Sequence, residues 1–182
     1  MSTPIRVLIA DDQALVRGAL ATLLGLEHDI DVVAQTGTGR AVTAMVREHA
    51  VAVALLDLDG VCFAGEARVP YAADNVNAAR AAGMRLSFVT NNASRTPAQV
   101  VAKLAGFGIE ADEQQIYTAA MDAVALLAEH VPAPATVLVV GGAGVEQALT
   151  EAGYTTTRSA LDKPVAMVKG YDPSVVWAAM SE

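Results

Sequence analysis

The sequence predicts an α/β fold built on a doubly wound parallel sheet. Short apolar segments alternate along the chain with segments whose apolar residues recur at helical spacing, which is the pattern of repeated strand–helix units. Several apolar segments stop at acidic, hydroxyl or amide residues, where open α/β sheets usually bind ligands. Hydrophobic residues make up 53% of the chain and aromatic residues 4%, so an aliphatic core with helices packed on a sheet is favoured over a sandwich or barrel.

The central strand of this sheet is predicted at residues 51–56. Its six residues are all apolar, which is typical of a strand buried on both faces in the middle of a parallel sheet. It runs directly into Asp57, and Asp59 and Gly60 follow. The two aspartates are therefore candidates for chemistry, although a strand end followed by an ordinary Asp-Gly turn explains them as well.

The residues before the central strand predict two further strand–helix units. The first strand ends at Asp11-Asp12, and Asp12 is a candidate N-cap for the helix that follows. Because strand, helix, strand and helix lead back to the central strand, the connections are of the βαβ type and the sheet is parallel. The predicted strands are 5–10 and 30–34, and the predicted helices are 14–24 and 41–49.

Beyond the central strand the alternation continues, and a strand at 85–90 ends in Thr90-Asn91. We expect a Rossmann-like core over residues 1–132 and, after the Pro-Ala-Pro segment that begins at Pro132, a partial cap-like α/β segment over 133–182. The remaining predictions are helices at 72–82, 97–104, 121–130 and 145–152, strands at 115–118, 136–140 and 165–168, a tight turn at 141–144, and a last helix from Asp172 that contains Trp177.

Composition narrows the classes of partner and location. The net charge is −8 and no window concentrates Lys or Arg, so nucleic acid is not expected as a partner. No apolar run is long enough to span a bilayer, and no export signal precedes the first strand, so no membrane partner is expected. Cys62 is the single cysteine, which excludes an internal disulfide and is compatible with a cytoplasmic protein.

The polar strand ends predict a metal site if the first, central and fourth strands are neighbours. Carboxylates about 4 Å apart repel by roughly 4 kcal/mol per pair at an effective dielectric near 20, so the acids Asp11, Asp12 and Asp57 need a cation to share one site. Mg²⁺ is expected, because it takes oxygen ligands and leaves positions open for phosphate oxygens. An aspartate beside such an ion can attack phosphorus while Thr90 donates a hydrogen bond to a peripheral phosphate oxygen.

The central segment resembles a known family. Leu55-Leu-Asp57-Leu-Asp59-Gly60-Val61 and, later, Phe88-Val-Thr90-Asn91-Asn92-Ala-Ser94-Arg95 are similar to the first two motifs of the haloacid dehalogenase superfamily of phosphatases. Within it they resemble the branch of the NagD, phosphoglycolate, glycerol-phosphate, pyridoxal-phosphate and nitrophenyl-phosphate phosphatases, over about residues 51–182. The resemblance implies Asp57 as nucleophile, Asp59 as general acid and base, the Asp59 carbonyl as a metal ligand, and phosphate binding by Leu58, Thr90 and Asn91.

Residues 4–50 resemble a different family. Ile5-Arg-Val-Leu-Ile-Ala-Asp11-Asp12-Gln13-Ala-Leu15-Val-Arg17 is similar to the start of a response-regulator receiver domain. In receivers, paired acids after the first strand hold Mg²⁺ and an aspartate that ends the third strand accepts phosphate. Because Asp57 ends the third predicted strand, both resemblances imply the same role for it, and a receiver-like half joined to a phosphatase-like half still forms one sheet.

The sequence also departs from both patterns. Phosphatases of this superfamily carry a lysine and further acids after a cap, and receivers carry a lysine after their fifth strand. Asp11 and Asp12 are candidates to replace the acids, but Lys103, Lys163 and Lys169 fall in surface positions, so weak activity is expected.

Three functions therefore stay open. The first is a Mg²⁺-dependent phosphohydrolase that acts on small phosphomonoesters through an aspartyl phosphate, which the acid at Asp59 favours because turnover needs it. The second is a receiver-like module that accepts phosphate from a phosphodonor on Asp57, and the third is a chimeric or truncated chain with little activity. The apolar surface of an unfinished cap also favours a homodimer.

Overall fold

The computed structural model describes residues 3–172, and its contacts divide the chain into two compact units. Unit 1 comprises Met1–Val89 and Val101–Ile116, and unit 2 comprises Thr90–Val100 and Tyr117–Glu182. The predicted α/β class with a parallel sheet is confirmed. The expected division into a core over 1–132 and a cap-like segment over 133–182 stays a prediction.

The larger sheet has five strands in the order β2-β1-β3-β6-β7. β1 pairs in parallel with both β2 and β3, and β3 pairs in parallel with β6. In the register, Ala10 of β1 lies opposite Leu56 of β3, so the residues that follow these two strands emerge at the same edge of the sheet. The strands are β1 (Ile5–Ala10), β2 (Ile30–Thr36), β3 (Val53–Asp57), β6 (Arg85–Thr90) and β7 (Ile116–Thr118).

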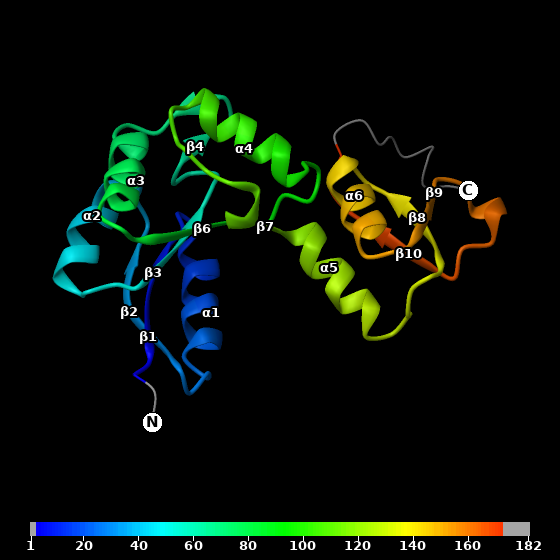
Figure 1. Cartoon of the computed structure of the whole chain (residues 1–182), viewed down its shortest axis with the longest axis horizontal. Helices are drawn as coiled ribbons and strands as arrows, with labels where there is room; N and C mark the ends of the chain where they lie inside the picture. The colour runs from blue at the N-terminus through cyan, green and yellow to red at the C-terminus, as the bar shows by residue number, and fades with distance from the viewer. Residues whose placement is uncertain (1–2, 173–182) are drawn as a thin grey trace. The chain divides into compact units, whose positions relative to one another are not determined.

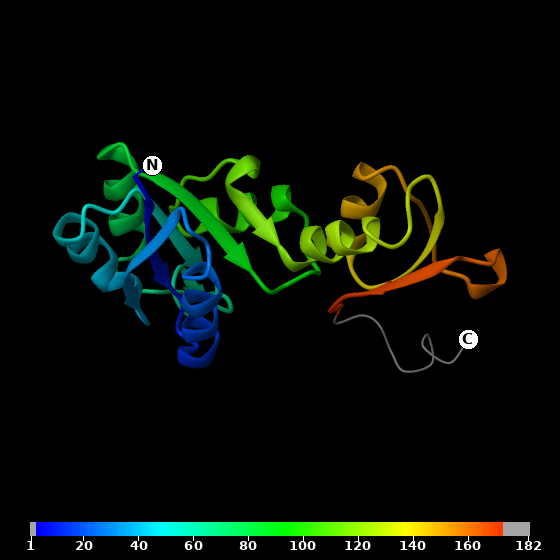
Figure 2. The same ribbon diagram turned by 90° about the horizontal axis from the view of Figure 1, so that it is seen from below.

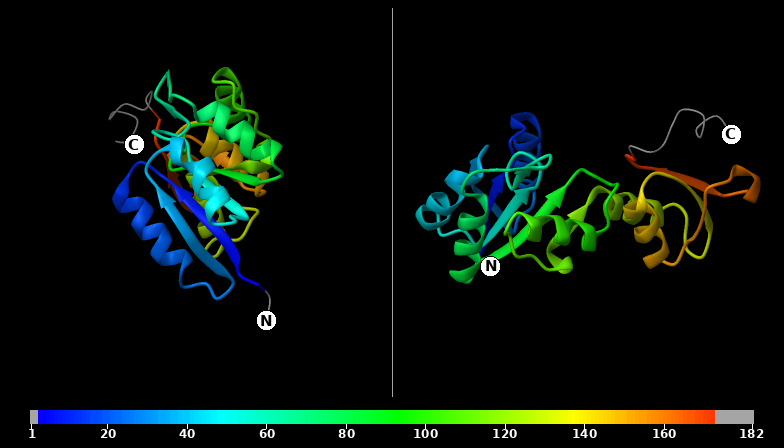
Figure 3. Two further views of the ribbon diagram at one scale, coloured as in Figure 1. Left: turned by 90° about the vertical axis from the view of Figure 1, so that its left-hand side faces the viewer. Right: turned by 90° about the horizontal axis from the view of Figure 1, so that it is seen from above.

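Helices lie on both faces of the strands of unit 1. α1 (Ala14–Leu24) lies on one side of β1 and β2, whereas α2 (Gly39–Glu48) and α3 (Ala72–Ala81) pack on each other on the opposite side (Figures 1 and 3). Right-handed crossovers require this, since the chain moves one way from β1 to β2 and the other way from β2 to β3. The arrangement is the doubly wound pattern that the sequence predicts.

The predicted N-cap of α1 is wrong. Gln13 occupies the cap position, and no side chain caps the helix. The reason is that both neighbouring acids are otherwise engaged: the carboxylate of Asp11 accepts the N–H of Gln13, and the side chain of Asp12 lies against Gly60. The acids of this turn therefore face the sheet edge instead of the helix.

The core of unit 1 forms from the inward residues of the central strands. Leu8, Leu56 and Phe88 are completely buried, and each comes from a different one of the neighbouring strands β1, β3 and β6. Burial of side chains of this size contributes about 1.5–3 kcal/mol each. The apolar residues that predict these strands are thus also the residues that stabilise the sheet.

A short hairpin follows β3 and was not predicted. β4 (Phe63–Ala64) and β5 (Ala67–Arg68) pair antiparallel, and the ring of Phe63 stacks on Phe107 with centroids 5.3 Å apart. Two-residue strands carry too little periodicity to be recognised in a sequence. Val61 and Cys62 alone separate Gly60 from the hairpin, so the hairpin bounds the predicted site.

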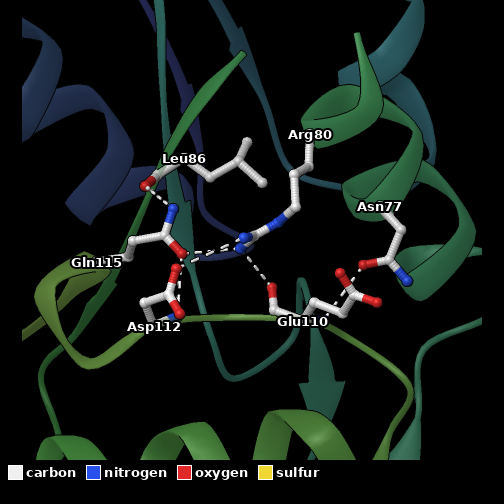
Figure 4. Close-up of polar contacts among 6 residues, drawn as sticks. All are labelled: Asn77, Arg80, Leu86, Glu110, Asp112 and Gln115. Atoms are coloured by element: carbon white, nitrogen blue, oxygen red, sulfur yellow. Dashed lines mark hydrogen bonds and ion pairs between the residues drawn. The ribbon is translucent and has the colours of Figure 1, made fainter. Parts of the chain in front are cut away.

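A polar network fixes α3 to the segment that leads into β7 (Figure 4). Arg80 donates to the Glu110 carbonyl at 2.6 Å and to the Gln115 side chain at 2.8 Å. Gln115 in turn donates to the Leu86 carbonyl of β6 at 3.1 Å. A single guanidinium therefore ties α3, the 3₁₀ helix η1 (Glu113–Gln115) and β6 together.

Unit 2 contains a second, three-stranded parallel sheet in the order β10-β8-β9. α6 packs on this sheet and on α5 (Figure 2), and Val137, Val139 and Leu149 are central to the core between them. The predicted tight turn at 141–144 is replaced in its second half by the start of α6, because Gly142 is the N-cap of that helix. Its glycines are needed, since a Cβ at Gly142 or Gly144 would overlap the backbone of Ser94 or Arg95. The elements are α4 (Pro97–Gly106), which spans both units, α5 (Ala119–Ala128), β8 (Thr136–Val140), α6 (Ala143–Glu151), β9 (Thr155–Thr157), the 3₁₀ helix η2 (Ala160–Asp162) and β10 (Ala166–Lys169).

Other predicted elements are present, with small differences at their ends, but β9 was not predicted. The helix predicted from Asp172, with Trp177, lies outside the described residues. Among the helices of residues 3–172, none is long and apolar enough to cross a bilayer.

Candidate active site

Three aspartates converge at the carboxyl edge of the larger sheet. Asp11, Asp12 and Asp57 each place a carboxylate oxygen within 4.8 Å of the others, and we call them the acidic cluster. Asp11 and Asp12 follow β1, and Asp57 ends β3, so the cluster depends on the pairing of these two neighbouring strands. The sequence predicts that these acids meet if their strands are neighbours. The strands are neighbours, and the three carboxylates do meet.

Asp11 is the buried member and is held by three hydrogen bonds. Its N–H donates to the Thr36 carbonyl at 3.1 Å, and its side chain accepts the N–H of Gln13 at 2.7 Å. Its own carbonyl accepts a hydrogen bond from Nη1 of Arg17 at 2.5 Å. The backbone and the carboxylate of Asp11 are thus fixed before any ligand arrives.

Asp12 is exposed and lies against the turn that follows β3. Gly60 has φ +90°, and a Cβ on it would overlap the carboxylate of Asp12. Glycine is required here both for the left-handed backbone and for the close approach of this side chain. Gly60 therefore packs against a member of the acidic cluster, and the part of Asp59 in the site stays a prediction.

Asp57 has an altered acidity. Its pKa is raised from 3.8 to about 7, mainly by burial. A hydrogen bond from the Leu58 backbone opposes this rise in pKa, and the negative charges of Asp11, Asp12 and Asp59 add to it. Burial also raises the pKa of the nearby Cys62 thiol to about 12, with a further contribution from Asp57. A positive charge beside Asp57 would lower its pKa again and favour the ionised carboxylate.

The donor set of the cluster suits a hard divalent cation. All the candidate ligand atoms are carboxylate oxygens, without the sulfur or imidazole nitrogen that softer metals favour. Asp11, Asp12 and Asp57 would hold the ion, and the mutual repulsion that raises the pKa of Asp57 would then become attraction to it. The residues present therefore fit Mg²⁺.

The next two residues of the predicted site differ in exposure. Leu58 is buried, and its carbonyl accepts the N–H groups of Cys62 and Phe63, both at 3.0 Å. Asp59 is exposed, and its carboxylate accepts the N–H of Gly65 at 3.0 Å across the β4–β5 turn. The carboxylate of Asp59 lies outside the acidic cluster, and its roles in acid–base chemistry and, through its carbonyl, in metal binding stay predictions.

Thr90 and Asn91 belong to unit 2. Thr90 ends β6 and is 7% exposed, and its hydroxyl accepts the N–H of Asn92 at 3.2 Å. Asn91 is exposed. Their part in phosphate binding, like that of Leu58, stays a prediction.

The three lysines of the chain have different surroundings. Lys103, the one in unit 1, pairs with Glu66 at 3.1 Å and lies 4.3 Å from the centre of the Phe63 ring. Lys163 follows η2 in a left-handed conformation, and Lys169 is exposed at the end of β10. Arg17 is instead the cation bonded to a residue of the acidic cluster, and its only signal in the sequence is its place in the receiver-like segment.

Comparison with known proteins identifies the family. The profile described as haloacid dehalogenase-like hydrolase matches residues 54–155, which include most of β3 with Asp57 and all of β6 and α6. The chain belongs to this family. The same comparison does not extend to residues 4–50, so the receiver-like resemblance of that segment is not shown.

Two curated relatives are phosphatases by name. The chain is 37% identical over 123 residues to the 5'-nucleotidase YutF of Bacillus subtilis, covering 68% of this chain and 46% of that protein. It is 34% identical over 128 residues to the D-glycerol 3-phosphate phosphatase of Mycobacterium tuberculosis, covering 70% of this chain and 35% of that protein. The chain thus spans less than half the length of either relative.

Solved structures give the same result. A glycerol phosphate phosphatase from Mycobacterium tuberculosis, crystallised with calcium, matches with a TM-score of 0.66 at 33% identity over 72% of this chain and 38% of that one. Its magnesium complex matches with a TM-score of 0.65 at the same identity, over 72% of this chain and 39% of that one. These neighbours were therefore crystallised with divalent cations of the kind that the acidic cluster fits.

Proposed function

We propose that this chain is a Mg²⁺-dependent phosphohydrolase that acts on small phosphomonoesters through an aspartyl phosphate on Asp57. The observation that carries the proposal is the convergence of Asp11 and Asp12 with Asp57 at the carboxyl edge of the sheet. Family membership and the phosphatase names of the relatives support it. Because the chain covers only part of those proteins, the activity itself is a proposal.

The proposed cycle assigns one task to each aspartate of the Asp57-Leu58-Asp59 segment. Asp57 attacks phosphorus and forms the aspartyl phosphate, while Asp59 donates a proton to the leaving alcohol and then removes one from the water that attacks the acyl phosphate. Asp59 suits this because it is solvent-exposed and its carboxylate is oriented by the Gly65 N–H. When bound, Mg²⁺ neutralises negative charge between the carboxylates and the phosphate.

Phosphate contacts are proposed for Leu58, Thr90 and Asn91. Thr90 has a hydroxyl that can donate to phosphate while it accepts the Asn92 N–H. Slow turnover is expected, because the engaged Lys103 leaves no lysine of unit 1 for the transferred phosphoryl group. Loss of such a partner costs about 100–1,000-fold in rate.

The test is release of p-nitrophenol from p-nitrophenyl phosphate with and without Mg²⁺. Asp57→Asn should lower turnover by at least about a thousandfold and Asp59→Asn by about 100–10,000-fold, since each removes an essential group. Asp74→Asn changes an acid of α3 outside the cluster and serves as the control. Activity that survives Asp57→Asn would rule the proposal out.

A second function is supported by the same cluster. We infer that residues 4–50 are a receiver-like half, because paired acids after β1 lie beside the aspartate that ends β3. Such a module would accept phosphate on Asp57 without rapid turnover. Incubation with acetyl phosphate and Mg²⁺ distinguishes the two functions. Labelling close to one phosphate per chain without hydrolysis supports the receiver. The absence of both labelling and turnover supports a chimeric chain of little activity.

A further inference from the structure

We propose that Arg17 is a positioning residue that holds the Asp11–Asp12 peptide in place for the divalent cation. The inference rests on the proposed metal site and concerns a residue that the family resemblance leaves without a role. Arg17 lies on α1, yet its guanidinium turns back and donates to the carbonyl of Asp11. That carbonyl belongs to the peptide that joins Asp11 to Asp12, so one hydrogen bond fixes the link between two members of the cluster.

The guanidinium sits in a slot that the backbone keeps open. At Gly37, just after β2, a Cβ would lie 3.3 Å from Nη1 of Arg17 and 3.9 Å from the Asp11 carbonyl oxygen. A Cβ at this position would therefore press on the guanidinium, whereas its distance to the carbonyl oxygen is an ordinary van der Waals contact. The absence of a side chain at Gly37 leaves room for Arg17 between β2 and the end of β1.

The charge of Arg17 opposes the repulsion within the cluster. Three carboxylates within 4.8 Å of one another push the Asp11–Asp12 turn away from Asp57 when no cation is bound. A guanidinium stays protonated at any working pH, and a hydrogen bond from a charged donor is about twice as strong as a neutral one. Arg17 thus holds the cluster assembled in the metal-free protein, so less ordering is required when the cation binds.

Arg6 provides a matched control at the opposite end of the same strand. Its Nε donates to the His49 carbonyl at 2.9 Å, so it also joins an arginine to a backbone carbonyl. It lies at the start of β1, whereas the acidic cluster follows the end of that strand. A purely structural role for Arg17 predicts that Arg17→Gln and Arg6→Gln behave alike.

The experiment measures Mg²⁺ binding to the full chain by isothermal titration calorimetry, with thermal melts in chelator to record stability. Loss of a residue that orients metal ligands costs about 10–100-fold in metal affinity, and we expect a loss of this size for Arg17→Gln. Arg6→Gln should keep the affinity within about twofold of wild type. Arg17→Lys should fall between them, because it keeps the charge but not the planar guanidinium, and it also serves if Arg17→Gln does not fold.

The outcomes separate this inference from the proposed function. If wild type and Arg17→Gln bind Mg²⁺ equally well, the role of Arg17 is overturned but the metal site is not. Equal weakening by Arg6→Gln also overturns it, since the effect would then be structural. If wild type does not bind Mg²⁺ at millimolar concentration, the metal site of the proposed function is overturned, and the positioning role of Arg17 with it.

Discussion

Asp57 destabilises the metal-free protein at neutral pH. Its pKa is raised to about 7, mainly by burial, whereas the ordinary value is 3.8. Between these two values the folded protein binds more protons than the unfolded chain, so the contribution of Asp57 to stability falls as the pH rises from about 4 to about 7. The residue that is proposed to perform the chemistry therefore reduces stability until a cation is bound.

We predict that Asp57→Asn raises the melting temperature of the metal-free protein at pH 8 but not at pH 4. The amide removes a charge that is buried and repelled at pH 8, whereas the wild-type carboxyl is largely protonated at pH 4. Thermal melts in chelator across this range would measure the difference. A variant that is less stable than wild type at pH 8 in chelator would contradict the prediction, and added Mg²⁺ should stabilise only the wild type.

We predict that Gly60→Ala disrupts the acidic cluster more than Gly65→Ala does. Both glycines have positive φ, +90° for Gly60 and +58° for Gly65, so both alanines carry a backbone cost of about 1–2 kcal/mol. Only the alanine at position 60 meets Asp12, whereas nothing lies within 4 Å of a Cβ at position 65. Mg²⁺ affinity should fall by about tenfold or more for Gly60→Ala alone, and equal losses for both variants would disprove the role of Gly60.

At the scale of elements, Arg80 and Asn77 provide the short polar attachments of α3 to the segment before β7. Asn77 donates to the Gly108 carbonyl at 2.7 Å and accepts the Glu110 N–H at 3.2 Å. Arg80 reaches the Glu110 carbonyl and the Gln115 side chain, and a longer ion pair of 3.8 Å joins it to the exposed Asp112 (Figure 4). The ion pair is solvent-exposed on one side and contributes little. Arg80 itself therefore contributes mainly through its two short hydrogen bonds.

We predict that Arg80→Met lowers the free energy of unfolding by about 1–3 kcal/mol, because the Gln115 side chain loses its charged donor. Arg68→Met is the control, since Arg68 is exposed and makes one long hydrogen bond of 3.4 Å to the Gly106 carbonyl. Urea unfolding of both variants would measure the difference. Equal effects would show that the network around Gln115 is not what stabilises α3.

At the scale of the whole molecule, α1 has an apolar outer face. Arg17 is its only charged residue, and its guanidinium turns inward to the Asp11 carbonyl. Leu15 is 87% exposed, and Leu23 and Leu26 are also exposed on or just after the helix. A helix that is apolar all round usually packs against another element, and the net charge of −8 disfavours close approach of two copies elsewhere.

We therefore propose that the expected homodimer forms through α1 and not through the cap-like segment that the sequence favours. Leu15→Glu should shift the protein toward monomer, because two carboxylates would be forced into an apolar contact. Leu161→Glu is the matched control, since Leu161 is 88% exposed but lies in η2 of unit 2. Sedimentation velocity at several concentrations would measure the effect, and a wild-type monomer at all concentrations would refute the expected dimer.

Much of the fold follows from local patterns. The apolar run of β3, the mostly apolar β1 and the helical periodicity between them predict a parallel sheet, since an apolar run like that of β3 must be buried on both faces. The same runs mark where each strand stops, so they locate Asp11, Asp12 and Asp57 as candidate site residues. Two-residue strands such as β4 and β5 were missed, because so short a stretch has no measurable period.

The composition of the chain and the spacing of its apolar residues were enough to establish its α/β class and which acids end its strands. The meeting of those acids within 4.8 Å, the guanidinium of Arg17 on the Asp11 carbonyl and the raised pKa of Asp57 emerge only from the folded chain. The physical reason is the separation along the sequence of the residues that determine each property. Burial patterns are set by residues a few positions apart, whereas a carboxylate's neighbours and acidity depend on strands that the chain brings together from distant segments.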